Sequence, residues 1–190
     1  PNIEIAVNEI TTQGDQLLDA DLPAIGGKGV FIKEIEEALL RHEIDFAVHS
    51  LKDMPTDVMA GLKFAAIPTR ADARDVLISR EKLALDNLPS GAVVGTGSPR
   101  RACQLLGHRS DLRVKGIRGN VDTRLRKLEE GQYDAILLAS AGLKRLDMLE
   151  IVTEYLEPGV MLPAVGQGAL AVQVRSEDSF VKGLIAQLND

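Results

Sequence analysis

Short apolar runs alternate with amphipathic stretches along almost the whole 190-residue chain. Runs with period-two alternation, or with continuous aliphatic residues, predict strands. These strands are expected at residues 3–7, 44–48, 62–66, 75–78, 92–94, 112–114, 135–138 and 170–174. Apolar residues spaced three and four apart predict helices between the strands. The helices are expected from about Phe31 to Arg41, from Ser98 onward, from Asn120 to Gly131, and after Ser176–Asp178 through Leu188.

This alternation is typical of an α/β fold with mainly parallel sheets and helices on both faces. Two segments have the character of crossings between lobes, Pro68–Arg70 and Ala164–Gly168. If the strand at 170–174 rejoins the first sheet, residues 1–68 plus 168–190 form a first domain and residues 69–167 an inserted second domain. Two lobes joined by two crossings predict an interlobe cleft.

The turn Gly95–Arg101 places two cations where a helix dipole disfavours them. Ser98 has the character of an N-cap and Pro99 that of the first helical residue. Arg100 and Arg101 then lie at the positive end of the helix, at a cost of about 0.3–1 kcal/mol per charge. Free backbone N–H groups and guanidinium groups together predict a site for a carboxylate or a phosphate.

A second strand–turn–helix unit repeats this arrangement. Arg118 precedes the helix predicted from Asn120, and Arg124 lies near the first turn of that helix. Open α/β sheets bind ligands beyond the carboxyl ends of their strands, so both pairs of arginines are expected to face the cleft from the second domain. The alternative is that these arginines are solvated and pair with nearby Asp and Glu residues.

The strand at 44–48 leads into a polar cluster, His49–Pro55. Within it, Asp53 is a candidate acid–base or ion-pairing residue, with Lys52 beside it. Cationic neighbours would lower the pKa of Asp53, whereas burial would raise it. A plain polar turn fits the spacing equally well, and His49 is expected to have a structural role.

Three glycines surround Lys28 in the segment Ile25–Phe31. Such a segment is typical of a mobile lid whose lysine reaches an anion, and equally of a plain flexible loop. Its spacing differs from that of a Walker A loop. The sequence also lacks the Cys and His spacings of a metal site, a nucleophile elbow and a dinucleotide fingerprint.

The composition narrows the class of ligand and the compartment. The formal net charge is −6 and the chain has two Tyr, four Phe and no Trp, so it lacks the basic face and the stacking platforms of a nucleic-acid-binding protein. A small polyanionic substrate fits better. No apolar run reaches the roughly 20 residues of a membrane span. A single cysteine, Cys103, is typical of a reducing compartment, so a cytoplasmic protein is expected. Cys103 lies among apolar helix residues, which predicts a buried, inert thiol.

Five motifs, in order along essentially the full chain, resemble the porphobilinogen deaminase (hydroxymethylbilane synthase) family of heme and other tetrapyrrole biosynthesis. They are Val48–Pro55, Val94–Arg101, Ile117–Leu125, Ala139–Leu146 and Leu162–Ala169. The resemblance implies a fold like that of type II periplasmic binding proteins. It also implies a transferase that condenses four porphobilinogen molecules, with loss of ammonia, into the linear tetrapyrrole hydroxymethylbilane.

The same resemblance implies roles for residues at matching positions. Asp53 matches the catalytic aspartate of the family. The arginines that match residues binding the acetate and propionate groups of cofactor and substrate are Arg100, Arg101, Arg118 and Arg124. Further matches are Lys52, Ser98 and Gln167 at cofactor-binding positions, and Lys28, Phe31, Ser50 and Thr96 at substrate or lid positions.

Two parts of the family pattern match nothing in this sequence. One is an N-terminal strand and helix, and the other is a third, C-terminal domain whose cysteine holds the covalent dipyrromethane cofactor; Cys103 does not match that cysteine. The chain, which begins at Pro1, is therefore expected to be part of a longer enzyme, monomeric when full length, and inactive by itself. The alternative function is a non-catalytic periplasmic-type or regulatory module for a small dicarboxylate, which needs no aspartate at a strand end.

Overall fold

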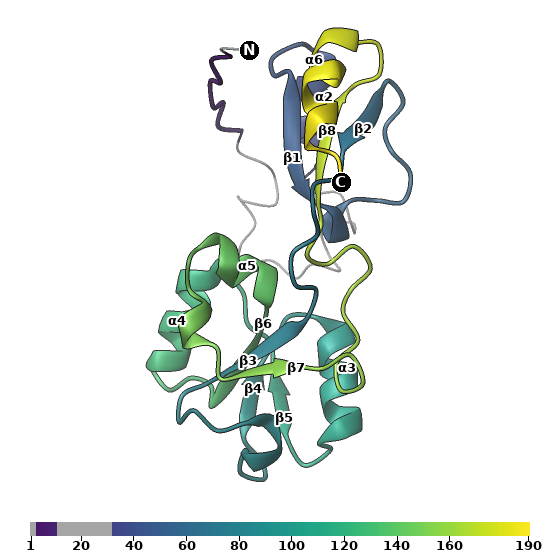
Figure 1. Ribbon diagram of the computed structural model, residues 1–190. Helices are drawn as coiled ribbons and strands as arrows, with labels where there is room; N and C mark the ends of the chain where they lie inside the picture. Colours follow the sequence, from purple (N-terminus) through teal and green to yellow (C-terminus); the bar gives the residue numbers. More distant parts are fainter. Residues whose placement is uncertain (1–2, 11–31) are drawn as a thin grey trace. The chain divides into compact units, whose positions relative to one another are not determined.

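A computed structural model describes residues 3–10 and 32–190. The chain divides into two compact units (Figure 1): unit 1 comprises Pro1–Thr69 and Leu170–Asp190, and unit 2 comprises Arg70–Ala169. The chain therefore passes from unit 1 into unit 2 and back again. None of the helices in the described ranges has the length and apolar character needed to cross a membrane. The predicted lid residues Lys28 and Phe31 lie outside the described residues.

Unit 1 is built on a three-stranded sheet with a helix on each face. β8 (Leu170–Arg175) lies between β1 (Phe46–Ser50) and β2 (Leu62–Ala66) and is antiparallel to both. Successive side chains of a strand point to opposite faces, so the sheet supports two separate apolar clusters. α2 (Lys33–Leu40) packs in one of these clusters and α6 (Ser179–Ile185) in the other.

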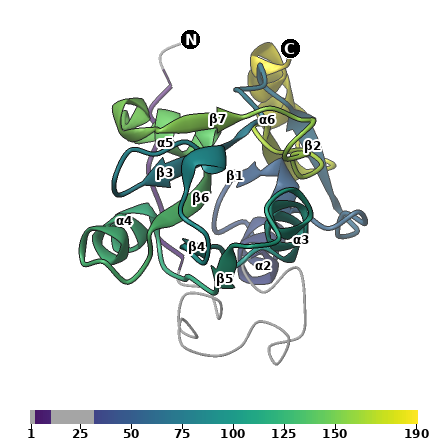
Figure 2. The ribbon, with the colours of Figure 1, turned by 90° about the horizontal axis from the view of Figure 1, so that it is seen from below.

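Unit 2 is built on a five-stranded sheet in the order β5-β4-β6-β3-β7. Its strands are β3 (Asp75–Ser79), β4 (Val93–Gly95), β5 (Arg113–Lys115), β6 (Ala135–Ala139) and β7 (Glu154–Leu156). Its helices are α3 (Pro99–His108), α4 (Val121–Glu129) and α5 (Ser140–Arg145). α3 covers one face of the sheet, and α4 and α5 cover the other (Figures 1 and 2). The described residues also contain short 3-10 helices: η2 (Leu51–Asp53), η3 (Leu85–Asn87), η4 (Leu149–Ile151) and η5 (Ala186–Leu188).

The α/β class is confirmed, but the prediction of mainly parallel sheets is wrong. Among the strands in residues 3–10 and 32–190, only β4 forms parallel pairs, with β5 and with β6; the pairings β1–β8, β2–β8, β3–β6 and β3–β7 are antiparallel. A helix between two strands imposes a parallel pair only when it returns the chain to the neighbouring strand, as α3 does between β4 and β5. β8 enters its sheet after the chain returns from unit 2, and β3 follows the first crossing, so no such helix sets their direction.

The predicted strand at residues 3–7 is not present. The described residues 3–10 form no strand, and Ile3, Ile5 and Val7 are exposed. Apolar alternation stabilises a strand only when a neighbouring strand satisfies its backbone groups, and among the described residues no strand pairs with this segment. β7 and α5, in contrast, are elements that the apolar pattern did not predict.

At one end of the unit 2 sheet, the last residues of β4, β5 and β6 lie beside the first residue of β3. Gly95 and Lys115, the last residues of β4 and β5, are paired in register. Ala139, the last residue of β6, is paired with Asp75, the first residue of the antiparallel strand β3. The segments that follow β4, β5 and β6 therefore emerge beside the start of β3, and they carry the predicted arginines.

Candidate functional site

The first arginine turn is fixed by short-range hydrogen bonds. Ser98 is the N-cap of α3 and its hydroxyl accepts a hydrogen bond from the Arg101 amide at 3.4 Å, with Pro99 as the first helical residue. The buried Thr96 hydroxyl accepts from the Ser98 amide at 3.1 Å. The helix start predicted at Ser98 is confirmed, and Arg100 and Arg101 lie in its first turn.

Arg101 is bound to a carboxylate that the sequence reasoning did not identify. Its Nε and Nη2 lie 3.0 and 2.7 Å from Asp75 Oδ1, and its Nη1 donates to the Leu137 carbonyl oxygen at 3.1 Å. Arg101 is 7% exposed and Asp75 is 0% exposed. Both charged groups are thus buried, and the free-energy cost of removing them from water is offset because they are paired and hydrogen-bonded to each other.

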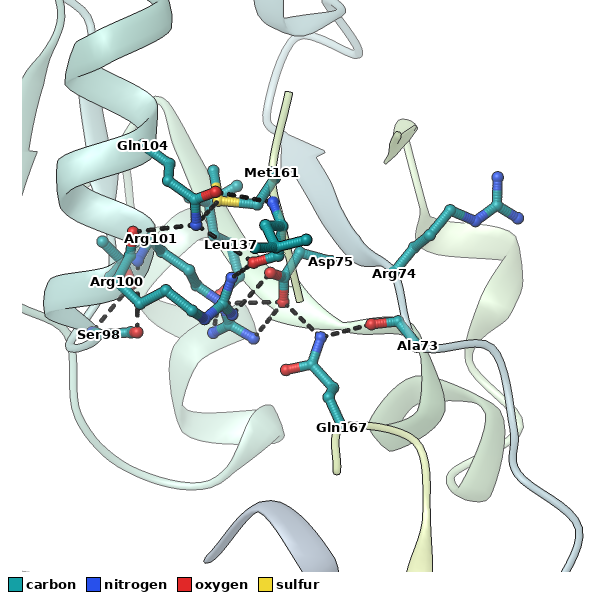
Figure 3. Close-up of polar contacts among 12 residues, drawn as sticks. Ala73, Arg74, Asp75, Ser98, Arg100, Arg101, Gln104, Leu137, Met161 and Gln167 are labelled. Atoms are coloured by element: carbon teal, nitrogen blue, oxygen red, sulfur yellow. Dashed lines mark hydrogen bonds and ion pairs between the residues drawn. The ribbon is translucent and has the colours of Figure 1, made fainter. Parts of the chain in front are cut away.

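The same carboxylate binds two further side chains (Figure 3). Arg100 Nη2 lies 2.7 Å from Asp75 Oδ2, while its Nη1 donates to the Leu162 carbonyl oxygen. Gln167 Nε2 donates to Asp75 Oδ1 at 2.9 Å and to the Ala73 carbonyl oxygen at 2.7 Å. Arg100 and Arg101 point toward Asp75 from α3, and Gln167 points toward it from the segment that precedes β8.

Asp75 was predicted only as a residue of a strand. The signal that identifies it is its place in a fully buried strand, since a charged residue at such a position is almost always paired. The adjacent Arg74 is not part of the cluster: it points away from Asp75 in Figure 3 and pairs with Asp72 and Glu157. For Arg100 and Arg101 the proposed alternative, pairing with a nearby acid, thus applies in part, because one buried carboxylate serves two guanidinium groups.

The second arginine turn begins α4 in the predicted place. Asn120 is the N-cap, and its side-chain oxygen accepts from the Thr123 amide at 3.0 Å. Arg124 Nε donates to the Gly119 carbonyl oxygen at 2.8 Å, where Gly119 has φ +106°. The Arg118 carbonyl oxygen accepts from Lys127 Nζ at 3.3 Å.

Arg124 is a partly desolvated cation close to another. Burial lowers the pKa of Arg124, and the positive charge of Arg101 lowers it further. Among the described residues, no carboxylate lies within ion-pair distance of Arg124. Arg100, Arg101 and Arg124 bring three positive charges and Asp75 brings one negative charge, so this group of four residues has a surplus of two positive charges. Such a surplus on preorganised N–H donors can bind a ligand with two carboxylates.

The remaining predicted site residues that are described lie in unit 1. Asp53 is exposed at the end of η2, directly after β1, whose last residue is Ser50. Lys52 is half-buried within η2. Unit 1 and unit 2 are described separately, so the predicted meeting of Asp53 with the arginines stays a prediction.

His49 has the structural role that was expected. It is buried on β1, and its Nε2 lies 2.9 Å from Gln173 Oε1. Gln173 Nε2 donates in turn to Glu36 Oε1 at 2.7 Å, which connects β1, β8 and α2. Burial lowers the pKa of His49, although the hydrogen bond with Gln173 and the charge of Glu36 both act to raise it.

The prediction of a buried thiol at Cys103 is wrong. Cys103 is exposed on α3, because the buried face of this helix is defined by Arg101 and Leu105, which are one turn apart. Cys103 lies midway between them in sequence and therefore about 200° around the helix from Arg101. Arg101 thus occupies the buried face of α3. Within the described ranges, no group of three or more His, Cys, Asp or Glu side chains is arranged to hold a metal ion.

Comparison with known proteins identifies a protein family whose sequence model matches this chain. The sequence model described as porphobilinogen deaminase, dipyromethane cofactor binding domain, matches residues 1–183. Proteins named porphobilinogen deaminase from Bacillus pumilus and Roseiflexus castenholzii are 53% and 54% identical over 191 and 190 residues, covering 100% of this chain. The one from Bacillus subtilis is 52% identical over 191 residues. The chain spans 61%, 63% and 61% of the length of these three relatives.

Solved structures agree on the fold at low sequence identity. A putative methionine-binding lipoprotein from Bacillus subtilis matches with a TM-score of 0.53 and 15% identity over 83% of this chain and 75% of its own. A periplasmic substrate-binding protein of an ABC transporter from Coxiella burnetii matches with a TM-score of 0.52 and 17% identity, over 80% of this chain and 74% of its own. The predicted likeness to periplasmic binding proteins is confirmed.

Proposed function

Because the chain belongs to the porphobilinogen deaminase family, we propose that it forms the cofactor-binding part of an enzyme that joins four porphobilinogen molecules head to tail into hydroxymethylbilane. The family description names a dipyrromethane cofactor, and its acetate and propionate groups suit guanidinium donors. When bound, that cofactor supplies the pyrrole end to which the first substrate is joined. We assign the cofactor to Lys52, Ser98, Arg100, Arg101, Arg118, Arg124 and Gln167, and the four arginines among them also to the acetate and propionate groups of the substrate.

The observation that supports this proposal is the surplus of two positive charges around Asp75 in a protein of net charge −6. Each porphobilinogen carries two carboxylates. Arg100 and Arg124 retain N–H donors that no protein acceptor in the described residues uses, because each guanidinium has five and the protein contacts occupy only some of them. We therefore assign the carboxylates of a pyrrole to these donors, with the buried pair of Asp75 and Arg101 left intact.

The aspartate supplies the chemistry in this proposal, and the arginines supply position. Cleavage of the aminomethyl C–N bond of porphobilinogen releases ammonia and leaves an electron-poor azafulvene. The Asp53 carboxylate stabilises the positive charge that develops on the pyrrole nitrogen and accepts or returns its proton. The free α-carbon of the neighbouring pyrrole then forms the new C–C bond, and its proton is lost to restore aromaticity.

We place the enzyme in the cytoplasm as a monomer, with Ser50, Thr96 and the lid residues Lys28 and Phe31 contributing to substrate binding. A single cysteine suits a reducing compartment.

The test uses the full-length protein with porphobilinogen. The wild type should release ammonia, whereas a receptor for dicarboxylates would bind the pyrrole and leave it unchanged. Asp53→Asn should reduce kcat by at least about a thousandfold and leave substrate binding within a few-fold of wild type. Asp57→Asn is the matched control, since it makes the same chemical change at an exposed position four residues away. Near-normal turnover by Asp53→Asn would refute the assignment.

A further inference from the structure

Asp75 is a fully buried carboxylate at the centre of the arginine cluster. It contacts no solvent, and its two oxygens receive Arg100, Arg101 and Gln167. We infer that Asp75 is the positioning residue of the anion site: it fixes the guanidinium groups of Arg100 and Arg101 and compensates part of their positive charge. The inference rests on the proposed function for the identity of the ligand.

The two arginines differ in how many of their N–H donors are bound to the protein. Arg101 uses Nε and Nη2 on Asp75 and Nη1 on the Leu137 carbonyl oxygen, so its guanidinium plane is fixed on both edges. Arg100 Nη2 lies at ion-pair distance from Asp75 Oδ2, an atom that accepts no hydrogen bond from the described residues, while its Nη1 donates to the Leu162 carbonyl oxygen and its side chain stays 26% exposed. Asp75 therefore holds both cations in place, and the remaining donors of the more exposed Arg100 are oriented before a ligand arrives, which reduces the entropy lost on binding.

The charge balance points the same way. Without Asp75, the guanidinium groups of Arg100, Arg101 and Arg124 would carry three uncompensated positive charges in a partly desolvated place. With Asp75 the surplus of these four residues falls from three positive charges to two, and it remains favourable for a ligand with carboxylate groups. Gln167 also reaches Asp75, from the segment by which the chain leaves unit 2, and so ties that segment to the site.

The test compares Asp75→Asn with Asp111→Asn in the full-length protein. Both substitutions remove one negative charge and one carboxylate partner of an arginine, but Asp111 pairs with Arg109 ahead of β5, at the opposite end of that strand from the site. Asp75→Asn should raise the KM for porphobilinogen about tenfold with kcat within about threefold of wild type, the loss expected for one charge-assisted hydrogen bond. Its KM should also depend more steeply on salt concentration, because three positive charges are then exposed to screening instead of two. Asp111→Asn should change neither quantity.

A second variant and a measurement on the wild type keep the inference testable if Asp75→Asn does not fold. Asp75→Glu retains the charge and displaces it by one methylene, so KM should rise at least threefold while the salt dependence stays that of wild type. In the ligand-free wild type, ¹⁵N-detected hydrogen exchange of Arg101 Nε–H should be slowed at least a hundredfold relative to free arginine.

Three results would overturn the inference: a folded Asp75→Asn protein with wild-type KM and salt dependence, wild-type KM in Asp75→Glu, or unprotected Arg101 Nε–H. The proposed function fails separately, if the wild type releases no ammonia from porphobilinogen. The exchange measurement needs no ligand and so distinguishes the two failures.

Discussion

Gly168 lies directly against the carbonyl group of Ala71: a Cβ atom built on Gly168 would come within 2.5 Å of the Ala71 oxygen. Gly168 also has φ +87°, a backbone conformation that residues with side chains rarely adopt. The Ala71 amide donates to the Gly168 carbonyl oxygen at 3.1 Å. The two segments through which the chain enters and leaves unit 2 are therefore hydrogen-bonded to each other at a contact that only glycine permits.

Gly168→Ala should lower the free energy of unfolding by about 2–4 kcal/mol, since the strained φ costs roughly 1–2 kcal/mol and the clash with a backbone oxygen adds to it. Urea unfolding followed by circular dichroism measures the change. Gly107→Ala is the matched control: a Cβ there meets nothing within 4 Å, and in α3 alanine should raise stability by about 0.5–1 kcal/mol. A loss below about 0.5 kcal/mol in Gly168→Ala would mean that the two segments separate freely.

Asn120→Ala should lower the free energy of unfolding by about 1 kcal/mol, because it removes the acceptor for the Thr123 amide at the start of α4. Asn120→Asp keeps an acceptor at the same place and should retain wild-type stability to within about 0.5 kcal/mol. Thermal unfolding of the three proteins side by side decides the question, and equal transitions for alanine and asparagine would show that the cap contributes nothing.

The starts of α3 and α4 could be predicted from the sequence because capping depends on residues three apart. Ser98 reaches the Arg101 amide and Asn120 reaches the Thr123 amide, and both contacts are present. Arg100 and Arg101 can be identified as candidate site residues for the same reason, since their conflict with the helix dipole is local.

Asp75 could not be assigned its partners from the sequence, because Arg101 is 26 residues away and Gln167 is 92 residues away. Only the folded sheet brings these positions to one edge. The strand directions were missed for a related reason, since β3 and β8 follow crossings between the units rather than a helix that returns the chain. The alternation of apolar and polar residues at 3–7 did not lead to a strand, because no strand among the described residues pairs with this segment.

Cys103 should react with a thiol reagent in the native protein at a rate within about tenfold of the rate after unfolding in urea, because it is exposed on α3. With a thiol reagent that releases a chromophore, the signal from Cys103 is the difference in absorbance between the wild type and Cys103→Ser. This difference counts one thiol whatever other cysteines are present. The same substitution should change stability by less than about 0.5 kcal/mol. Protection of this thiol until global unfolding would contradict the helix orientation in the structure.

The hydrogen bonds of Gln173 determine which ring nitrogen of His49 carries a proton. Gln173 Nε2 donates to Glu36, so Gln173 Oε1 is left to accept from His49 Nε2. A neutral ring that donates through Nε2 satisfies this contact, and burial lowers the pKa of His49. His49, four residues before Asp53 in the chain, is therefore harder to protonate in the folded protein than in the unfolded chain.

This lowered pKa makes the stability of the protein depend on pH with a defined sign. Below about pH 6.5 the unfolded chain binds a proton at His49 more readily than the folded protein does. The contribution of His49 to the free energy of unfolding is therefore fully present above that pH and is lost as the pH falls toward the pKa of the folded state. His49→Gln should remove a loss of the order of 1 kcal/mol between about pH 7.5 and pH 5.5, measured by urea unfolding at each pH. Other titrating groups are common to both proteins, so the difference between them at each pH isolates His49. A difference that stays constant across this range would mean that His49 binds protons equally well in the folded and unfolded states.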